Sequence, residues 1–294
     1  MQLPDVSKLD MGMRSEAMGE GVDAASYGVL EQRVVASDID KAAEELTHLG
    51  YAVVDSGYSS EQIDDIGRMF DAVHGKYVDT YGKDFLMAID EYNGIRLPLA
   101  FDDKLIDLAA NRRVLDVVKN QIDNEFVLNQ QNGIINPPGE KYNQGAWHRD
   151  LPYQHFVSTK PLAINALYCV DDFTSRNGAT LVIPASHTQE KYPSDHFIEA
   201  NATQVTAPAG SFIVLNGMLF HKGGFNDTSI ARRAVNHVYT VAFIKQQIDI
   251  PSALADRPIQ SAELDVLLGY RYRMPRTIDD FLEDRRQRAE SASA

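Results

Sequence analysis

Seven short β-rich runs follow one another from Phe126 onward, and they constrain the fold more than any other feature of the sequence. Gly, Pro and Asn separate the runs, and no crossover helix of the kind that joins parallel strands is evident between them. Such a pattern favours antiparallel double sheets. We therefore predict a mainly β fold with flanking helices, built on a double-stranded β-helix core of the jelly-roll, cupin-like kind. The runs are FVLNQ, GIIN, LAINALYCV, ATLVIP, QVTAP, SFIVLN and AVNHVYTVAFI.

Helical periodicity precedes these runs and predicts a helical N-terminal layer on the β core. Ser37 has the position of an N-cap, and Gly50 is placed to end the helix that Ser37 begins. Ser59 and Gln62 have capping-box spacing at the start of a second helix, which runs to about Tyr81. Four further segments are expected: a strand at Tyr51–Asp55 and helices at about Asp103–Ile122, Ala262–Leu268 and Ile278–Arg288.

The chain divides into an N-terminal arm and one domain. Residues 1–35 contain several glycines and no clear periodicity, so we expect an irregular arm there. Neither an internal repeat nor a low-complexity linker interrupts the remainder. Residues 36–294 are therefore expected to form a single jelly-roll domain with a helical N-terminal layer and C-terminal helices.

Composition restricts the class of protein and its partners. Hydrophobic residues make up 44% of the chain, and no apolar run is long enough to span a membrane. The net charge of -14 opposes binding to nucleic acid or to anionic membranes, so a small molecule is the expected partner. The N-terminus lacks the apolar segment of a signal peptide, which predicts a cytoplasmic location. Oligomerisation stays open, and the single cysteine, Cys169, excludes an internal disulfide.

A histidine and an aspartate two residues apart form the first element of a candidate metal site. His148 and Asp150 would project from the same face of an extended strand and could hold one ion. His221 follows a later β-rich run and precedes two glycines. Two imidazoles and one carboxylate are the ligand set of non-haem Fe(II) oxygenases, and they leave open positions for a chelating co-substrate and O2.

An arginine beyond the second histidine adds a candidate carboxylate site. Arg232 opens the strand that is expected to run near the metal, and a guanidinium there could clamp the distal carboxylate of 2-oxoglutarate. The alternative is that Arg232 and Arg233 are surface charges at a strand start, and one of the pair is expected to be. The spacing favours Arg232.

These motifs resemble those of the phytanoyl-CoA dioxygenase-like branch of the 2-oxoglutarate oxygenases. The resemblance extends from about Gly50 to Gly269 and is carried by GYAVVDSGYSSEQI, IINPPGEKYNQGAWHRD, DDFTSRNGATLVIPASH and LFHKGGFNDTSIARRA. It implies that His148, Asp150 and His221 bind Fe(II) and that Arg232 binds 2-oxoglutarate. His187, in the PASH turn, and His237 are interpreted as structural.

The rest of the co-substrate site follows the family only in part. The resemblance implies that Asn136 touches 2-oxoglutarate. Many relatives carry a serine two residues after the distal histidine as a further carboxylate partner, whereas this chain has Gly223. Thr180 or Gln130 could substitute for that serine.

By resemblance, the chain is an oxygenase that couples decarboxylation of 2-oxoglutarate to hydroxylation of an unactivated C–H bond in a small metabolite. Because Asp150 is retained where related halogenases carry a small residue, hydroxylation is favoured over halogenation. Desaturation, epoxidation or cyclisation would use the same ligands, and a catalytically silent jelly-roll binding protein is a further alternative. Candidate substrate residues, of mixed aromatic and polar character, are Arg96, Asn132, Tyr153 and Phe156.

Overall fold

The computed structural model describes residues 31–151, 156–254, 257 and 261–291, and its contacts divide the chain after Ala36. Within the first unit, residues 31–36 are exposed and have no regular secondary structure. The rest of the arm expected at residues 1–35 lies outside the described part of the chain. All helices and strands reported below belong to the second unit, which begins at Ser37.

The core is built from two antiparallel sheets. The larger sheet has six strands in the order β1-β7-β4-β9-β3-β2, and the smaller has three in the order β6-β5-β8. Every neighbouring pair is antiparallel. The strands are β1 (Tyr51–Asp55), β2 (Gly94–Arg96), β3 (Phe126–Asn136), β4 (Ala163–Cys169), β5 (Leu181–Val182), β6 (Thr203–Gln204), β7 (Ser211–Asn216), β8 (His221–Lys222) and β9 (Arg232–Val241).

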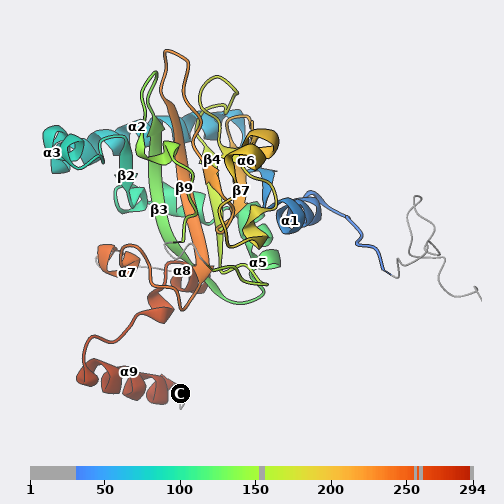
Figure 1. The fold of residues 1–294 in the computed structure, drawn as a ribbon. Helices are drawn as coiled ribbons and strands as arrows, with labels where there is room; N and C mark the ends of the chain where they lie inside the picture. Colours follow the sequence, from blue (N-terminus) through green and yellow to red (C-terminus); the bar gives the residue numbers. More distant parts are fainter. Residues whose placement is uncertain (1–30, 152–155, 255–256, 258–260, 292–294) are drawn as a thin grey trace, which may run out of the picture. The chain divides into compact units, whose positions relative to one another are not determined.

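Helices flank the larger sheet, and Figure 1 shows β3, β9, β4 and β7 side by side with α2 passing behind them. The short α6 lies between β5 and β6, which are antiparallel, so it is not a crossover helix. None of the described helices is both long and apolar enough to cross a membrane. The helices are α1 (Asp38–Leu49), α2 (Ser60–Tyr81), α3 (Lys83–Ala88), α4 (Lys104–Ala109), α5 (Arg112–Gln121), α6 (Asp195–Asn201), α7 (Ile250–Ala253), α8 (Ala262–Leu267) and α9 (Ile278–Ser291).

Strand β4 shows how the larger sheet separates two hydrophobic cores. Successive side chains of a strand point to opposite faces. Ala166 and Tyr168 pack in one cluster with helix residues such as Phe70 of α2. Leu167 and Cys169 pack in a second cluster with Val182 of the smaller sheet. The sheet is therefore buried on both faces, which explains why β4 reads as a continuous apolar run.

The expected helix signals at the start of the domain are confirmed. The Ser37 side chain accepts a hydrogen bond from the Asp40 amide, and Gly50 ends α1 with a φ of 83°. Ser59 and Gln62 form both hydrogen bonds of a capping box at the start of α2. These signals were readable because each involves residues within four positions of one another.

Three expectations need correction. The single helix expected at Asp103–Ile122 is two helices, because the Asn111 side chain caps α5 and also donates to the Ser56 carbonyl. The FVLNQ and GIIN runs form one strand, β3, with an irregular register between Leu128 and Gln130. Strand β2 was not expected, and it extends the sheet by pairing with the second half of β3.

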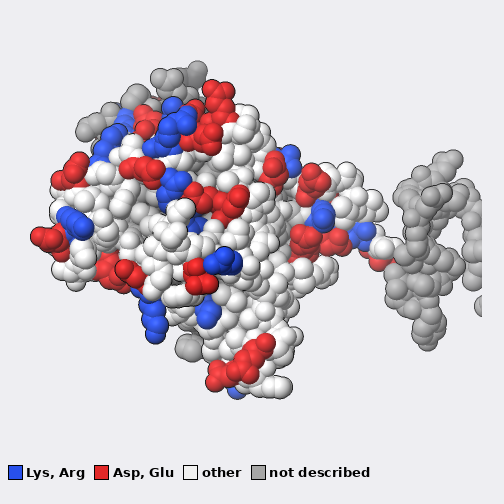
Figure 2. Space-filling view, turned by 90° about the horizontal axis from the view of Figure 1, so that it is seen from above, with Lys and Arg blue, Asp and Glu red and all other residues white. Residues whose placement is uncertain are grey.

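Charge is distributed without a dominant basic area on the face that Figure 2 presents. Lysine and arginine side chains are interspersed there with aspartate and glutamate side chains. A net charge of -14 would still permit a local basic surface, and the face in Figure 2 shows no extended one.

His237 makes folding stability depend on pH. Its side chain is fully buried on β9 between Gln131 and the Ala166 carbonyl, and burial lowers its pKa to about 4. The unfolded chain takes up this proton below about pH 6.5, whereas the folded chain does so only near pH 4. The stability contributed by the neutral imidazole is therefore lost as pH falls through this window.

We expect His237→Gln to flatten that dependence. Urea unfolding between about pH 7 and pH 4.5 should give a steeper loss for the wild type, by up to about 1.4 kcal/mol per pH unit. The control is His196→Gln, which changes an exposed histidine of α6 and should retain the wild-type slope. Equal slopes in wild type and His237→Gln would contradict the assignment.

Candidate metal centre

Two reciprocal backbone hydrogen bonds bring the metal-binding motifs together. The His148 amide donates to the His221 carbonyl, and the His221 amide donates to the His148 carbonyl, each over 3.0 Å. His148 lies outside the named strands and meets β8 as an isolated antiparallel bridge. Asp150 is held in turn by its amide, which donates to the Gly217 carbonyl. Residues far apart in sequence thus present their side chains to one point.

The three ligand atoms are close enough to hold one ion. His148 Nε2 lies 3.5 Å from Asp150 Oδ1, and His221 Nε2 lies 3.6 Å from Asp150 Oδ2. All three ligand atoms lie within 4.8 Å of one another. Atoms that bind a first-row divalent ion at about 2.1 Å are themselves roughly 3 to 4 Å apart. These spacings therefore suit a single ion.

Backbone carbonyls orient both imidazoles. His148 Nδ1 lies 2.8 Å from the Ala146 carbonyl oxygen, and His221 Nδ1 lies 2.9 Å from the Leu219 carbonyl oxygen. A carbonyl oxygen can only accept, so Nδ1 carries the proton in each ring. The Nε2 lone pairs are then free to bind a metal.

The electrostatics of the site also fit a cation. Burial raises the pKa of Asp150, but His221 and His148 outweigh this effect and leave the pKa below its ordinary value. Asp150 Oδ2 is buried and has no hydrogen-bond partner among the described residues. Burial lowers the pKa of His221 and so favours its neutral, metal-binding form. At His148 burial also lowers the pKa, but the hydrogen bond and the charge of Asp150, together with the Ala146 carbonyl, outweigh it and leave the pKa raised. An ionised carboxylate with a buried oxygen that accepts no hydrogen bond is suited to bind a cation.

A buried guanidinium closes the inner end of the site. A cavity of about 40 Å³ is lined by His148, Asp150, His221 and Arg232, among others. Arg232 is 2% exposed; it donates to the Gly178 carbonyl and to the Tyr142 hydroxyl, and its Nε has no partner. No described carboxylate forms an ion pair with it. Because an uncompensated buried charge is costly, Arg232 is suited to bind an anion.

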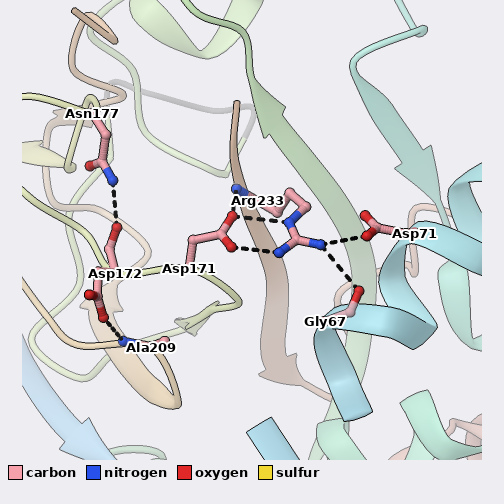
Figure 3. A network of polar contacts seen from close by, with 7 residues as sticks. All are labelled: Gly67, Asp71, Asp171, Asp172, Asn177, Ala209 and Arg233. Carbon is pink, nitrogen blue, oxygen red and sulfur yellow. Dashed lines mark hydrogen bonds and ion pairs between the residues drawn. The ribbon is translucent and has the colours of Figure 1, made fainter. Parts of the chain in front are cut away.

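The Arg233 side chain lies on the opposite face of β9 from Arg232 and stabilises the fold. Its guanidinium forms two hydrogen bonds with Asp171 and bonds Asp71 and the Gly67 carbonyl of α2, as Figure 3 shows. Consecutive residues of a strand face opposite sides, so only one of the two arginines can reach the cavity. Of the two arginines, Arg232 lines the inner cavity and Arg233 does not.

A second, outer cavity adjoins the candidate metal ligands. It measures about 230 Å³ and shares His148 and Asp150 with the inner cavity. Its wall includes the ion pair of Glu91 with Arg96, in which Arg96 Nε lies 2.8 Å from Glu91 Oε2. The two cavities therefore meet at residues of the candidate metal centre. Other outer-cavity residues are Asn93, Gln130, Asn132, Asn236 and Gln247.

The structure divides the remaining predicted site residues between these cavities and positions outside them. Thr180 lines the inner cavity, whereas Gln130, Arg96 and Asn132 line the outer one. Arg96 and Asn132 are register partners on β2 and β3. Gln130 is therefore better placed among the substrate candidates than in the co-substrate shell.

Two further predicted residues that the structure describes line neither cavity. Asn136 is buried, and its amide donates to the Gly224 carbonyl, so it holds the loop after β8. Phe156 is half exposed and is not part of either wall. Tyr153 lies outside the described residues.

The residues interpreted as structural histidines have core partners. His187 Nε2 lies 3.2 Å from the Thr47 carbonyl oxygen, and the His187 ring packs closely over Gly50. His237 lies in the core, as described above.

Several cavity residues were missed from the sequence. Asn236 lies four residues after Arg232 on the same face of β9, so strand periodicity could have identified it. Asn165 shares a face of β4 with Leu167 and could have been found in the same way. Tyr142 lies in a loop before the metal motif and gave no periodic signal.

An antiparallel β core that presents two imidazoles and one carboxylate to one point defines a metal site of the two-histidine, one-carboxylate kind. Comparison with protein families matches residues 47–234 to phytanoyl-CoA dioxygenase (PhyH). The match covers more than half of the chain, which therefore belongs to the PhyH family of dioxygenase enzymes.

Relatives and solved structures agree with this assignment. Uncharacterized protein Rv1501 of Mycobacterium tuberculosis is 30% identical over 254 residues, covering 84% of this chain and 92% of the relative. Dioxygenase af480 of Aspergillus fumigatus is 30% identical over 141 residues, covering 45% of this chain and 43% of the relative.

Two solved structures are similar in fold at low sequence identity. EctD from S. alaskensis, solved with 2-oxoglutarate and 5-hydroxyectoine, has a TM-score of 0.58 at 20% identity. The match covers 71% of this chain and 77% of the EctD chain. The epimerase SnoN, solved with Fe3+, alpha ketoglutarate and nogalamycin RO, has a TM-score of 0.55 at 17% identity. The match covers 76% of this chain and 91% of the SnoN chain.

We expect divalent metal to stabilise the metal-free protein through this site. Mn(II), added as a redox-stable probe at about 100 times its Kd, should raise the free energy of unfolding by about 2.7 kcal/mol. His221→Ala should abolish the increase in melting temperature, because it removes a ligand and leaves Asp150 without its partner. His196→Ala should respond like the wild type, and a full response in His221→Ala would exclude this site.

Proposed function

We propose that this chain is a non-haem Fe(II) and 2-oxoglutarate-dependent dioxygenase that hydroxylates an unactivated C–H bond of a small metabolite. The observation that carries the proposal is the buried Arg232, which has no carboxylate partner and shares a cavity with His148, Asp150 and His221. Membership of the PhyH family supports it, as does the presence of 2-oxoglutarate in the EctD structure. The two sheets would then be the halves of a jelly roll in a single domain from residue 36 onward.

His148, Asp150 and His221 would hold Fe(II), because their ligand atoms are close together. The lowered pKa values of Asp150 and His221 favour the ionised carboxylate and the neutral imidazole that bind a cation. The bound iron supplies O2 activation, and the reaction converts substrate, O2 and 2-oxoglutarate into hydroxylated substrate, succinate and CO2. The protein must exclude water and orient the reactants. His221 is buried in the wall of the inner cavity and the Asp150 side chain is only 13% exposed, which serves that requirement.

Arg232 would anchor the distal carboxylate of 2-oxoglutarate. Its guanidinium is fixed by the Gly178 carbonyl and lies 4.0 Å over the Phe173 ring, so it is oriented before the anion binds. The unpartnered Nε leaves a donor available to a carboxylate. Thr180 is the further predicted contact that lines the same cavity.

The outer cavity would take the substrate. Its wall carries the Glu91–Arg96 ion pair and several amide side chains, and the buried Asn132 Oδ1 has no hydrogen-bond partner. An unpaired buried acceptor favours a ligand that donates a hydrogen bond. A small polar metabolite suits this lining better than a long acyl chain does.

Hydroxylation is one of several outcomes that this ligand set supports. The retained carboxylate of Asp150 favours it over halogenation, whereas desaturation, epoxidation or cyclisation would require a different substrate position. SnoN is described as an epimerase, so the fold also accommodates that outcome in another protein. The cytoplasmic location stays a prediction from the sequence.

Cofactor binding and turnover test the proposal directly. Anaerobic addition of Fe(II) and 2-oxoglutarate to metal-free wild type should produce a weak visible charge-transfer band that is absent in His221→Ala. Under air, the wild type should release succinate, and a screen of small polar metabolites should identify compounds that increase the release. No band and no succinate from wild type would overturn the proposal.

Arg232 provides a second test. Arg232→Lys keeps a positive charge but cannot form two parallel hydrogen bonds, so the KM for 2-oxoglutarate should rise about tenfold or more. The matched control is Arg233→Lys, which should lower thermal stability by weakening the Asp171 ion pair and leave the KM close to the wild-type value. A larger KM effect at Arg233 than at Arg232 would reverse the assignment.

A further inference from the structure

Gly223 lies two residues after His221, and the structure gives a reason for a glycine at this position. A Cβ at position 223 would lie 1.7 Å from the Tyr142 hydroxyl oxygen and 2.6 Å from Tyr142 Cζ. Such distances are far shorter than any non-bonded contact. The backbone conformation of Gly223 does not require glycine. The Tyr142 side chain therefore fills the space that a side chain at position 223 would need.

The backbone holds Tyr142 in this place. The Gly223 amide donates to the Gln144 carbonyl over 2.7 Å, and the reciprocal bonds between His148 and His221 continue the pairing. A short turn follows Tyr142, in which the Gly145 amide donates to the Tyr142 carbonyl over 2.9 Å. The position of the phenol ring is thus set by the same pairing that assembles the metal ligands.

The Tyr142 hydroxyl is a hydrogen-bond donor without an acceptor. Its oxygen lies 3.4 Å from Arg232 Nη2 and accepts that hydrogen bond. No described residue accepts the hydroxyl hydrogen, although Tyr142 lines the inner cavity. Burial raises the pKa of Tyr142, and the nearby Arg232 only partly opposes the effect, so the hydroxyl stays protonated at neutral pH. A protonated hydroxyl beside a guanidinium is suited to a carboxylate.

We propose that Tyr142 and Arg232 together bind the distal carboxylate of 2-oxoglutarate, with the Tyr142 hydroxyl donating a hydrogen bond to it. This inference rests on the proposed function, because it assumes that the diacid occupies the inner cavity. Thr180 lines the same cavity and stays a further predicted contact, whereas Gln130 lines only the outer cavity.

The first test removes only the hydroxyl. Titration of the Mn(II)-loaded protein with 2-oxoglutarate by calorimetry should give a Kd about tenfold or more higher for Tyr142→Phe than for wild type. The Kd for Mn(II) alone should not change, because Tyr142 contacts none of the metal ligands through its hydroxyl. Equal 2-oxoglutarate affinity in Tyr142→Phe and wild type would overturn the inference.

The second test moves the hydroxyl to position 223. Gly223→Ser alone should weaken 2-oxoglutarate binding, because its Cβ collides with the phenol. Tyr142→Ala should also weaken it, since the hydroxyl is lost. The double variant Tyr142→Ala/Gly223→Ser should bind at least fivefold more tightly than Tyr142→Ala, because the collision is relieved and a hydroxyl returns.

The matched control is Tyr142→Ala/Gly223→Ala, which relieves the same collision without a hydroxyl and should show no recovery. Equal affinities of the serine and alanine double variants would mean that the phenol only fills space, and the inference would be wrong. Failure of the proposed function has a different signature: Mn(II)-loaded wild type would not bind 2-oxoglutarate at all. That result would contradict both the proposed function and the proposed carboxylate site of Tyr142 and Arg232.

Discussion

The reciprocal hydrogen bonds between His148 and His221 are the constraint on which the site depends. In an antiparallel pair, two residues that exchange both backbone bonds lie directly opposite and direct their side chains to the same face. The two imidazole rings consequently lie with their centroids 4.4 Å apart. Asp150, two residues on, falls on the same face, so one backbone pairing brings all three ligands together.

Strand alternation then separates the functional side chains from those that stabilise the fold. Between the ligands His148 and Asp150, the Arg149 side chain points the other way, donates to the Ser186 carbonyl and lies over the Phe220 ring. Arg232 and Arg233 divide their roles in the same way on β9. A single residue of register slip would exchange these faces and put the structural cations into the cavity.

The sequence was sufficient to predict features that depend on local patterns. The capping box of Ser59 and Gln62 and the closeness of His148 to Asp150 both rest on spacing along one segment. Spacing also selected Arg232, which lines the same cavity, and its binding of 2-oxoglutarate stays a prediction. The Asn111 cap was missed because the periodicity of α4 and α5 is continuous across it. Its capping role depends on tertiary contacts, including the bond to Ser56.

The same distinction applies to residues near the inner cavity. Asn136 donates its amide to the Gly224 carbonyl, a contact that only the folded chain reveals, and its contact with 2-oxoglutarate stays a prediction. Tyr142 gave no signal, because its place opposite Gly223 is set by pairing between segments distant in sequence. The only sign of this contact in the sequence was Gly223, at a position where the family resemblance led us to expect a serine.

The two cavities also differ in where their walls come from. The inner cavity is lined by residues of β3, β4, β7, β8 and β9 and by loop residues that include Tyr142 and His148. The outer cavity shares part of this wall and adds Arg96 from the edge strand β2 and Glu91 from the loop before it. Edge strands and loops tolerate change better than central strands do. Substitutions of Arg96 or Glu91 should therefore change the proposed substrate cavity and leave the backbone pairing of His148 with His221 intact.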